Sequence, residues 1–387
     1  MLASSPRGPV VKTPTRRASA YRSAQVDLEI VRRFGTRMIR IDAAQLRSLV
    51  HSVFRKVGCR EHEAERIAHY LVEANLVGHD SHGVIRVPQY VDWAERDRVR
   101  LNQELSVVMR TDALAVVDGN FGFGQVIGEQ AVDLGVDMAR RHGVAAVALR
   151  NSGHLGRIGD WPIRAAREGL ASVHFVNTSG LGVLVAPTGG IDRRLSANPI
   201  AAGMPVPGRS PLILDISTSA IAEGKLKVAR NRGEHVPENC IVDSEGRPTT
   251  DPHAFYATPP GALLPFGGHK GYGLSVMTEM FAGALTGNGC TDPEHATRLL
   301  NGMFSIYVDP ARLPPEPDWK QDVERFIRFV KSSRRIPECA EILMPGDVEE
   351  RTRERRLDDG IELDDLTWKS IVDTAEHLGL ALPSIGA

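Results

Sequence analysis

The sequence has few cysteines, and none of them is spaced for a metal site or a disulfide framework. Its four cysteines, Cys59, Cys240, Cys290 and Cys339, lie far apart, and no two of them form a C-x-x-C motif. Zinc ribbons use such close pairs, and small secreted domains are rich in cysteine. The pattern therefore argues against both classes and fits a protein of the reducing cytoplasm.

The chain also lacks a dominant charge and a long apolar run. Its 47 basic and 48 acidic residues leave a net charge of −1 over 387 residues. Proteins that bind nucleic acids or anionic membranes usually carry a basic excess. A membrane-spanning helix needs about 20 consecutive apolar residues. We therefore expect no nucleic-acid partner and no membrane partner, and we expect a small molecule as the ligand.

The first forty residues differ from the rest because they contain almost no acids. Asp27 and Glu29 are the only acids there, beside eight arginines and scattered serines and prolines. Such a composition cannot form an apolar core. We predict that residues 1–37 form a basic extension outside the folded protein. Composition leaves open whether it is an organelle-targeting segment, a disordered extension or an over-long start.

Apolar periodicity predicts helices at both ends of the chain and an alternating α/β region between them. Asp42 is the expected N-cap of the first helix, and short runs rich in β-branched residues alternate with helical stretches further on. The expected helices are 42–58, 61–78, 126–143, 157–169, 271–287 and 367–380, and the expected strands are 114–119, 144–149, 171–177, 211–217 and 303–309. These elements predict an α/β fold, with a mixed central sheet and flanking helices.

A glycine-rich stretch resembles the fingerprint of dinucleotide-binding folds. Residues 118–128, "DGNFGFGQVIG", lead from a predicted strand into a predicted helix, and Gly122, Gly124 and Gly128 form a G-x-G-x-x-x-G pattern there. In that fingerprint the next strand ends in an acid that binds a ribose. Here the next strand ends at 149–151 with leucine, arginine and asparagine. We therefore interpret the glycines as residues of a tight turn rather than as a phosphate-binding loop.

The stretch "GHDSHGVIRVPQY", residues 78–90, gathers unusual side chains just past a predicted helix end. As a metal site, it offers His79, Asp80 and His82, but no other cluster at ligand spacing completes a shell. A metal-dependent hydrolase built on these residues would lose activity on chelation. As a helix end, Asp80 and Ser81 simply cap the chain after the helix.

The same stretch also suits an active site. Ser81 and His82 can polarise a carbonyl, and Arg86 offers two parallel N–H groups to a carboxylate. Tyr90 follows one helical turn after Arg86. From these residues alone, the helix-end and active-site interpretations both stay open, and a second polar cluster favours the active site.

A second cluster occurs in "LRNSGHLGRIGDW", residues 149–161. Asn151, Ser152 and His154 follow a predicted strand at its carboxyl end, where ligands bind in α/β sheets. A single histidine there is often structural, but its pKa near neutrality suits proton exchange with a hydroxyl or carbonyl oxygen. Arg157 is left with two interpretations, contact with a second polar group of the substrate or contact with solvent.

Two further stretches suit an anionic ligand. "DISTSAIAEGK" leads from small hydroxyl side chains to Lys225, and "PFGGHKGYGL" flanks Lys270 with glycines ahead of a helix. Exposed amides, a lysine and a helix N-terminus favour phosphate. Neither stretch is a Walker A motif, so they predict anion binding without naming the ligand.

Six stretches together resemble one known family. The quoted motifs at 78–90, 149–161, "SANPIAAGMP", "LDISTSAIAEGK", "GGHKGYGLSVMTEMFAGALTG" and "MPGD" follow, in order and from about residue 38 to the end, the pattern of the type 2 malate/L-lactate dehydrogenase family. The family includes ureidoglycolate and sulfolactate dehydrogenases, diketogulonate reductase and cyclic-imine reductases. The resemblance implies hydride transfer between NAD(P)H and a small 2-oxo acid, on an NAD(P)-binding fold that is not a Rossmann fold.

The resemblance also implies roles for individual residues. His154 matches the family's proton acceptor, and Ser81, His82, Arg86 and Tyr90 match its substrate contacts. The residues that match cofactor contacts are Thr178, Asp215, Ile216, Ser217, Lys225, Lys270, Gly346 and Asp347. No metal is implied.

The resemblance further implies a domain division, a cofactor and an assembly. Residues 38–150 with 312–387 are expected to form a helical, substrate-side domain, and 151–311 the NAD(P)-binding domain. The implied cofactor is NAD, with NADP possible, and the implied assembly is a homodimer or larger. The motifs most resemble hydroxycarboxylate dehydrogenases, so we expect a 2-hydroxy acid dehydrogenase. A reductase of cyclic imino acids and a catalytically silent ligand-binding relative are the alternatives.

Overall fold

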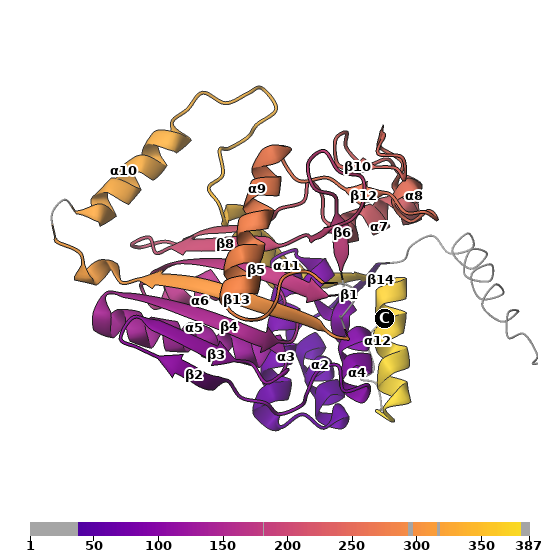
Figure 1. Ribbon diagram of the computed structural model, residues 1–387, viewed down its shortest axis with the longest axis horizontal. Coiled ribbons are helices and arrows are strands. Elements are labelled where there is room, and N and C mark those ends of the chain that lie inside the picture. The colour runs from indigo at the N-terminus through magenta and orange to yellow at the C-terminus, as the bar shows by residue number, and fades with distance from the viewer. Residues whose placement is uncertain (1–37, 181, 293–296, 316–317, 381–387) are drawn as a thin grey trace, which may run out of the picture.

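The computed structural model describes residues 38–180, 182–292, 297–315 and 318–380, which form three sheets with helices around them (Figure 1). The predicted basic extension, residues 1–37, lies outside the described residues. In the described ranges no helix is long and apolar enough to cross a membrane.

The largest sheet has seven strands and is mixed. Among its described strands, only the pair β3–β4 is parallel, and every other neighbouring pair is antiparallel. In spatial order the strands are β2 (Ser106–Arg110), β3 (Leu114–Asp118), β4 (Val144–Ser152), β13 (Leu299–Val308), β5 (Ala171–Gly180), β8 (Pro199–Met204) and β9 (Leu212–Ser217). The predicted mixed sheet is confirmed. A Rossmann fold is excluded, because a Rossmann sheet is mostly parallel and this sheet is mostly antiparallel.

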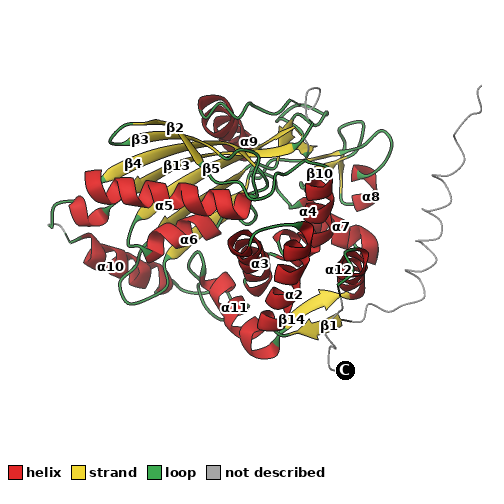
Figure 2. Cartoon of the chain, turned by 90° about the horizontal axis from the view of Figure 1, so that it is seen from below, coloured by secondary structure: helices red, strands yellow, loops and turns green. Residues whose placement is uncertain are grey.

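Helices cover both faces of this sheet (Figure 2). Small residues allow close packing on one face: a Cβ at Gly128 would lie 2.5 Å from the ring of Trp161, and one at Gly135 would lie 2.2 Å from Tyr307. That face is covered by α5 (Gly124–His142) and α6 (Asp160–Arg167), and the other by α9 (His269–Thr278) and its π-helical continuation η3 (Glu279–Leu285). The central strands of the sheet are therefore covered on both sides, while the edge strand β2 is exposed.

A second apolar core lies among helices beside the sheet (Figure 2). Asp42 accepts hydrogen bonds from the first-turn amides of α2, as predicted, and Gly58 ends that helix in a left-handed conformation. The elements of this layer are α2 (Ala43–Val57), α3 (Glu61–Leu76), η1 (Asp80–His82), η2 (Val84–Arg86), α4 (Val87–Glu95) and α12 (Asp365–His377), with the strand pair β1 (Met38–Ile41) and β14 (Ile361–Asp364). The first and last segments of the described chain therefore pack together.

The remaining elements form a small sheet and the long segment that connects β13 with β14. The five-stranded sheet has the order β11 (Pro248–Thr249), β10 (Ile241–Val242), β12 (Ala262–Leu263), β6 (Val183–Val185) and β7 (Leu195–Ser196), and α7 (Glu223–Arg232) and α8 (Pro252–Phe255) accompany it. The connecting segment comprises η4 (Pro310–Arg312), α10 (Trp319–Lys331) and α11 (Asp347–Asp359). Figure 1 shows α10 projecting away from the main sheet.

All five predicted strands are present, but the sequence pattern missed several elements. Strand β2 is exposed at every position, so the alternation of buried and exposed residues is absent. Helix α11 is charged along most of its length, with one buried residue, Asp347, and so gives no apolar stripe. Periodicity detects an element only where one of its faces is buried.

Candidate active site

The fold brings the two predicted polar clusters together. The rings of His82 and His154 stack, with centroids 5.7 Å apart and an interplanar angle of 10°. Tyr90 Oη lies 2.6 Å from Nδ1 of His154. Segments 64 residues apart in the sequence therefore share one site, because η1 and α4 lie against the turn that follows β4.

The turn that carries Ser81 and His82 is held by Asn75, at the end of α3. Asn75 Oδ1 accepts from the amide of Val84 at 2.8 Å, and its Nδ2 donates to Asp80 Oδ1 at 2.6 Å. A Cβ at Gly83 would lie 2.2 Å from Asn75 Oδ1, so a larger residue there would displace the Asn75 amide. The conformation of the turn thus depends on one buried amide, which the sequence pattern did not single out.

Asp80 has a structural role in this turn. Both of its carboxylate oxygens bind Arg356 of α11, at 2.6 and 3.0 Å. His79 points elsewhere, with Nε2 3.4 Å from Glu349 Oε1. Within the ranges that the structure describes, no group of three or more His, Cys, Asp or Glu side chains could hold a metal ion. Asp80 therefore connects side chains of α3 and α11 and does not cap the turn, which has no side-chain cap, while Ser81 and His82 face the second cluster.

The glycine-rich segment supports the backbone at His154. The amide of Gly153 donates to the carbonyl of Gly122 at 2.9 Å. A Cβ at Gly124, the first residue of α5, would lie 2.2 Å from the carbonyl oxygen of His154. This helix N-terminus therefore packs against the protein's own chain, and the glycines serve a tight turn and close packing.

We predict that Gly124→Ala destabilises the protein. The added methyl group overlaps the backbone of His154, so the turn or the helix has to move, which typically costs about 1–3 kcal/mol. The midpoint of thermal unfolding should fall. Gly273→Ala in α9 is the control, because a Cβ there meets nothing within 4 Å. An unchanged midpoint for Gly124→Ala would show that the turn has room to adjust.

Arg86 is oriented by its own neighbourhood. Its Nε donates to the carbonyl of Ser81 at 2.7 Å, and Nη1 donates to Gln89 Oε1 at 2.8 Å. Among the described residues, no carboxylate pairs with this guanidinium. Arg86 therefore brings an uncompensated positive charge beside the two histidines.

Burial and this charge keep both imidazoles neutral. Burial, Arg86 and His82 hold the pKa of His154 well below its usual value. Burial, followed by Arg86, lowers the pKa of His82 to about 3. Burial raises the pKa of Tyr90 to about 12, so its hydroxyl keeps its proton. At neutral pH the site contains a neutral base, a hydrogen-bond donor and a cation.

Neither interpretation of Arg157 was correct. Its side chain is 1% exposed, and Nη1 donates to Asp160 at 2.9 Å. Its Nε lies 3.7 Å from Asp215 Oδ2, which also accepts from the amide of Gly159 at 2.8 Å. Arg157 therefore binds the turn after His154 to strand β9 and is not available to solvent or to a substrate.

The residues matched to cofactor contacts lie along β9 and its neighbours. Asp215, Ile216 and Ser217 form its carboxyl half and pair with β8. Thr178 lies in β5, where its amide donates to Asn198 at 3.1 Å. Lys225 lies at the start of α7, whose Gly224 approaches Ser81: a Cβ there would be 3.1 Å from the Cβ of Ser81.

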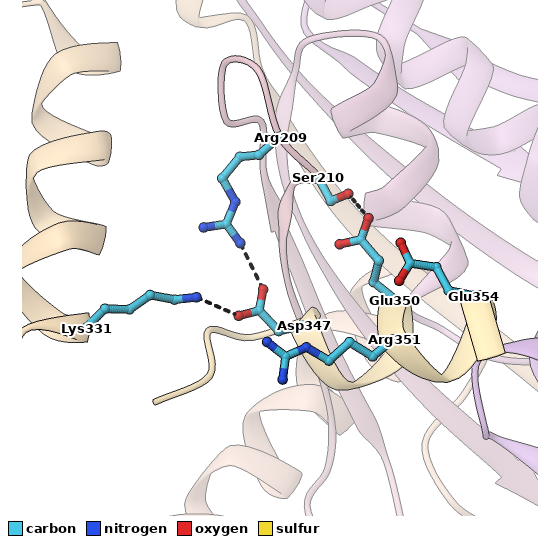
Figure 3. A pocket seen from close by; sticks show the side chains of 7 residues that line it. All are labelled: Arg209, Ser210, Lys331, Asp347, Glu350, Arg351 and Glu354. Atoms are coloured by element: carbon cyan, nitrogen blue, oxygen red, sulfur yellow. Dashed lines mark hydrogen bonds and ion pairs between the residues drawn. The ribbon is translucent and has the colours of Figure 1, made fainter. Parts of the chain in front are cut away.

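Gly346 and Asp347, at the N-terminus of α11, lie beside the start of β9. A Cβ at Gly346 would lie 3.4 Å from the amide nitrogen of Ile213. Asp347 lies in a surface pocket, where its carboxylate accepts from Arg209 at 2.8 Å and from Lys331 at 3.3 Å (Figure 3). The pocket is lined by Arg209, Ser210, Lys331, Asp347, Glu350, Arg351 and Glu354. Asp347 therefore organises positive charge in this pocket.

The other end of β9 fits a group that carries phosphate. Thr218 Oγ1 is buried without a hydrogen-bond partner in the described chain, and the Thr218 carbonyl accepts from the amide of Phe266. Gly267 and Gly268 then take left-handed conformations and lead Lys270 into α9. An unsatisfied hydroxyl, a lysine and the amides of a helix N-terminus suit an anion.

Sequence reasoning missed two buried side chains that contact residues of the candidate site. Asn75 and Gln125 are 1% and 0% exposed, each on a helix whose neighbouring buried residues are mainly apolar. Gln125 Nε2 donates to Tyr90 Oη at 3.1 Å. The available signal was a polar side chain at a position that helical periodicity assigns to the core.

Comparison with known proteins agrees with the geometry. A family model described as malate/L-lactate dehydrogenase matches residues 41–372. Hydroxycarboxylate dehydrogenase B of Escherichia coli strain K12 is 41% identical over 345 residues, covering 88% of this chain and 95% of that protein.

Solved structures share the fold. Malate dehydrogenase from Pyrococcus horikoshii OT3 matches with a TM-score of 0.80 at 32% identity, covering 89% of this chain and 97% of that one. A Δ1-piperideine-2-carboxylate reductase from Pseudomonas syringae matches with a TM-score of 0.76 at 30% identity, covering 87% and 100%. The chain belongs to the malate/L-lactate dehydrogenase family.

Proposed function

We propose that this protein is a 2-hydroxy acid dehydrogenase that transfers hydride between a nicotinamide cofactor and a small 2-oxo or 2-hydroxy carboxylate. One observation carries the proposal: a neutral histidine, His154, and Arg86, which has no carboxylate partner among the described residues, belong to one cluster. The first suits proton exchange with a hydroxyl, and the second suits a carboxylate on the adjacent carbon.

The residues divide the chemistry between them. Arg86 binds the substrate carboxylate and places the reacting carbon, a positioning effect worth several kcal/mol. His154 accepts the hydroxyl proton in oxidation and returns it in reduction. Ser81 Oγ and Nδ1 of His82 lie 3.1 Å apart and share one hydrogen, which leaves one hydrogen of the pair, on Ser81 Oγ or on His82 Nε2, to donate toward the developing oxygen charge. Tyr90 orients His154.

The cofactor, when bound, supplies the hydride acceptor or donor. We propose NAD, with NADP as the tested alternative. The holding residues are Thr178, Asp215, Ile216, Ser217, Lys270 and Gly346, because they surround β9 and the start of α9. Lys225 and Asp347 contribute charge at the two edges of the proposed cofactor site. Lys225 lies beside the turn that carries Ser81, and Asp347 lies in the pocket of Figure 3.

A panel assay tests the proposal. Purified protein is mixed with NADH or NADPH and with pyruvate, oxaloacetate, phenylpyruvate, ketopantoate or piperideine-2-carboxylate, and the loss of reduced nicotinamide is followed by absorbance. Oxidation with a 2-oxo acid, retained after exhaustive chelation, is the expected result. Binding of NADH without turnover of any compound would favour the silent relative instead.

Reduction of a cyclic imino acid is the second candidate function. The similarity to a piperideine-2-carboxylate reductase supports it. Such a substrate carries the same carboxylate next to the reacting carbon, and Arg86 would bind it in the same way. Turnover of piperideine-2-carboxylate alone in the panel would replace the first proposal with this one.

We also propose a homodimer or larger homo-oligomer of the cytoplasm. Four large apolar side chains on α9 and η3, Leu274, Met277, Met280 and Leu285, are between 38% and 60% exposed. An apolar surface of this kind is typical of a contact between subunits. The four cysteines are all unpaired, which fits a reducing compartment.

The direction of the reaction should respond to pH through His154. Its pKa lies well below the usual value, so at neutral pH the imidazole is neutral and ready to accept a proton. We expect kcat/KM for 2-hydroxy acid oxidation to stay level as pH falls through 6.5 and to decrease only at lower pH. For reduction, kcat/KM should rise as pH falls, because that direction needs the imidazolium.

Steady-state rates in both directions between about pH 5 and 9 test this pH dependence. If kcat/KM for oxidation begins to fall at a pH above the ordinary histidine pKa, the pKa of His154 is not lowered in the working enzyme.

A further inference from the structure

A buried chain of three side chains leads away from the proposed proton acceptor. Nδ1 of His154 lies 2.6 Å from Tyr90 Oη, and Tyr90 Oη lies 3.1 Å from Nε2 of Gln125. Gln125 is in the first turn of α5 and is 0% exposed. No role in the reaction described above involves the glutamine.

The number of hydrogens in this chain decides the tautomer of His154. Gln125 Nε2 can only donate hydrogen bonds, so the Tyr90 oxygen accepts from it. The single hydroxyl hydrogen of Tyr90 then points to Nδ1 of His154. The neutral imidazole in this arrangement carries its proton on Nε2, and Nε2 cannot accept another one from a substrate.

The opposite orientation of the amide reverses the chain. If Gln125 Oε1 faces Tyr90, it accepts the hydroxyl hydrogen, and the Tyr90 oxygen accepts from Nδ1–H of His154. Nε2 is then bare. In the structure Oε1 is buried without a hydrogen-bond partner among the described residues, so no second bond to it holds the present orientation.

We propose that Gln125 is a positioning residue that acts through Tyr90, and that its amide orientation determines which nitrogen of His154 carries the proton. The inference rests on the proposed dehydrogenase function. In this proposal the present amide orientation, with Nε2 toward Tyr90, corresponds to the resting tautomer, and turnover uses the orientation with the amide oxygen toward Tyr90.

In oxidation with the turned amide, Nε2 of His154 accepts the substrate hydroxyl proton and the ring becomes the imidazolium; a bound nicotinamide would take the hydride from the carbon. Reduction runs the same steps backward. Tyr90 keeps its proton throughout, because burial raises its pKa to about 12. Gln125 and Tyr90 therefore direct hydrogen bonds, and only His154 gains or loses a proton.

Two substitutions separate this role from simple packing. Gln125→Leu keeps the approximate volume and removes the acceptor, so kcat for oxidation should fall about 10- to 100-fold. KM should change little, because Gln125 does not contact the substrate. Gln125→Glu keeps the shape of the side chain, and its ionised carboxylate can only accept hydrogen bonds. Its kcat should stay near that of the wild type, and its negative charge should move the acid limb of the pH profile to higher pH.

The tautomer is measured directly by ¹⁵N NMR of protein labelled at histidine, with Tyr90→Phe to assign the effect to the chain. We expect the His154 proton on Nε2 in the free wild-type protein and on Nδ1 in Gln125→Glu. The NMR result does not depend on turnover. A wild-type protein without activity therefore counts against the proposed function, while the tautomer still tests this inference.

The inference is overturned if Gln125→Glu has the wild-type tautomer and pH profile, or if Gln125→Leu retains the wild-type kcat. A parallel rise of KM and fall of kcat in both variants would indicate general damage to the site and would also overturn it. If Gln125→Leu fails to fold, the isosteric Gln125→Glu variant decides alone.

Discussion

Replacing His154 with alanine is expected to lower kcat about 100- to 10,000-fold in both directions, the usual contribution of a general acid or base. The variant leaves the hydroxyl proton without an acceptor, although Arg86 still binds the carboxylate. KM should therefore change much less than kcat. Initial rates with the best substrate of the panel give both constants, and fluorescence titration with NADH gives the cofactor affinity, which should be unchanged.

A matched control separates chemistry from folding in this experiment. His142, in the last turn of α5, is exposed and lies outside the site, so His142→Ala should retain wild-type rates. The thermal midpoints of both variants should stay close to that of the wild type. If His154→Ala keeps more than about a tenth of the wild-type kcat, another group exchanges the proton and the assignment is wrong.

Replacing Arg86 with leucine should lower kcat/KM by about 100-fold or more. Removing one partner of a buried, hydrogen-bonded charge pair costs about 2–5 kcal/mol. Both constants should suffer, because the carboxylate clamp also places the reacting carbon. Arg86→Lys should recover only part of the loss, since an ammonium cannot form two parallel hydrogen bonds to a carboxylate.

The same variant should also move the pH profile. Arg86 is one of the causes that lower the pKa of His154. Without its positive charge that pKa rises, so the loss of oxidation on acidification should begin at a higher pH. Arg96→Leu is the control, because Arg96 is exposed at the end of α4 and pairs with Asp92 on the surface. Equal losses for the two arginine variants would refute a specific carboxylate clamp.

Local sequence signals predicted the parts of the fold whose cause is local. Asp42 and Gly58 mark the ends of α2 because a side-chain cap and a left-handed glycine act within a few residues. The strand at 303–309 was visible through its β-branched and aromatic residues, although β13 begins earlier, at Leu299. Strand β2 went unpredicted because all of its side chains are exposed. Helix α10 was overlooked although Val323, Phe326, Ile327 and Val330 recur in it at helical spacing.

The residues that carry the chemistry of the candidate site could be predicted from the sequence, but the side chains that hold them in place could not. His154, Arg86 and Tyr90 could be proposed because histidine, arginine and tyrosine at the ends of elements suit proton exchange and carboxylate binding. The only local signal of Asn75 and Gln125 is a polar side chain at a core position of a helix, which predicts burial but does not identify the hydrogen-bond partner. Their roles follow only from hydrogen bonds to segments 9 to 35 residues away.

By itself, the sequence determined the mixed α/β class, the family and the residue types of the site, because each of these depends on periodicity or on short motifs. Tertiary structure alone decided which of those residues meet. It stacked His82 on His154, assigned Asp80 to Arg356, and buried Arg157 between Asp160 and Asp215. Contacts of this kind join segments that are distant along the chain, and only the packing of the whole core sets their geometry.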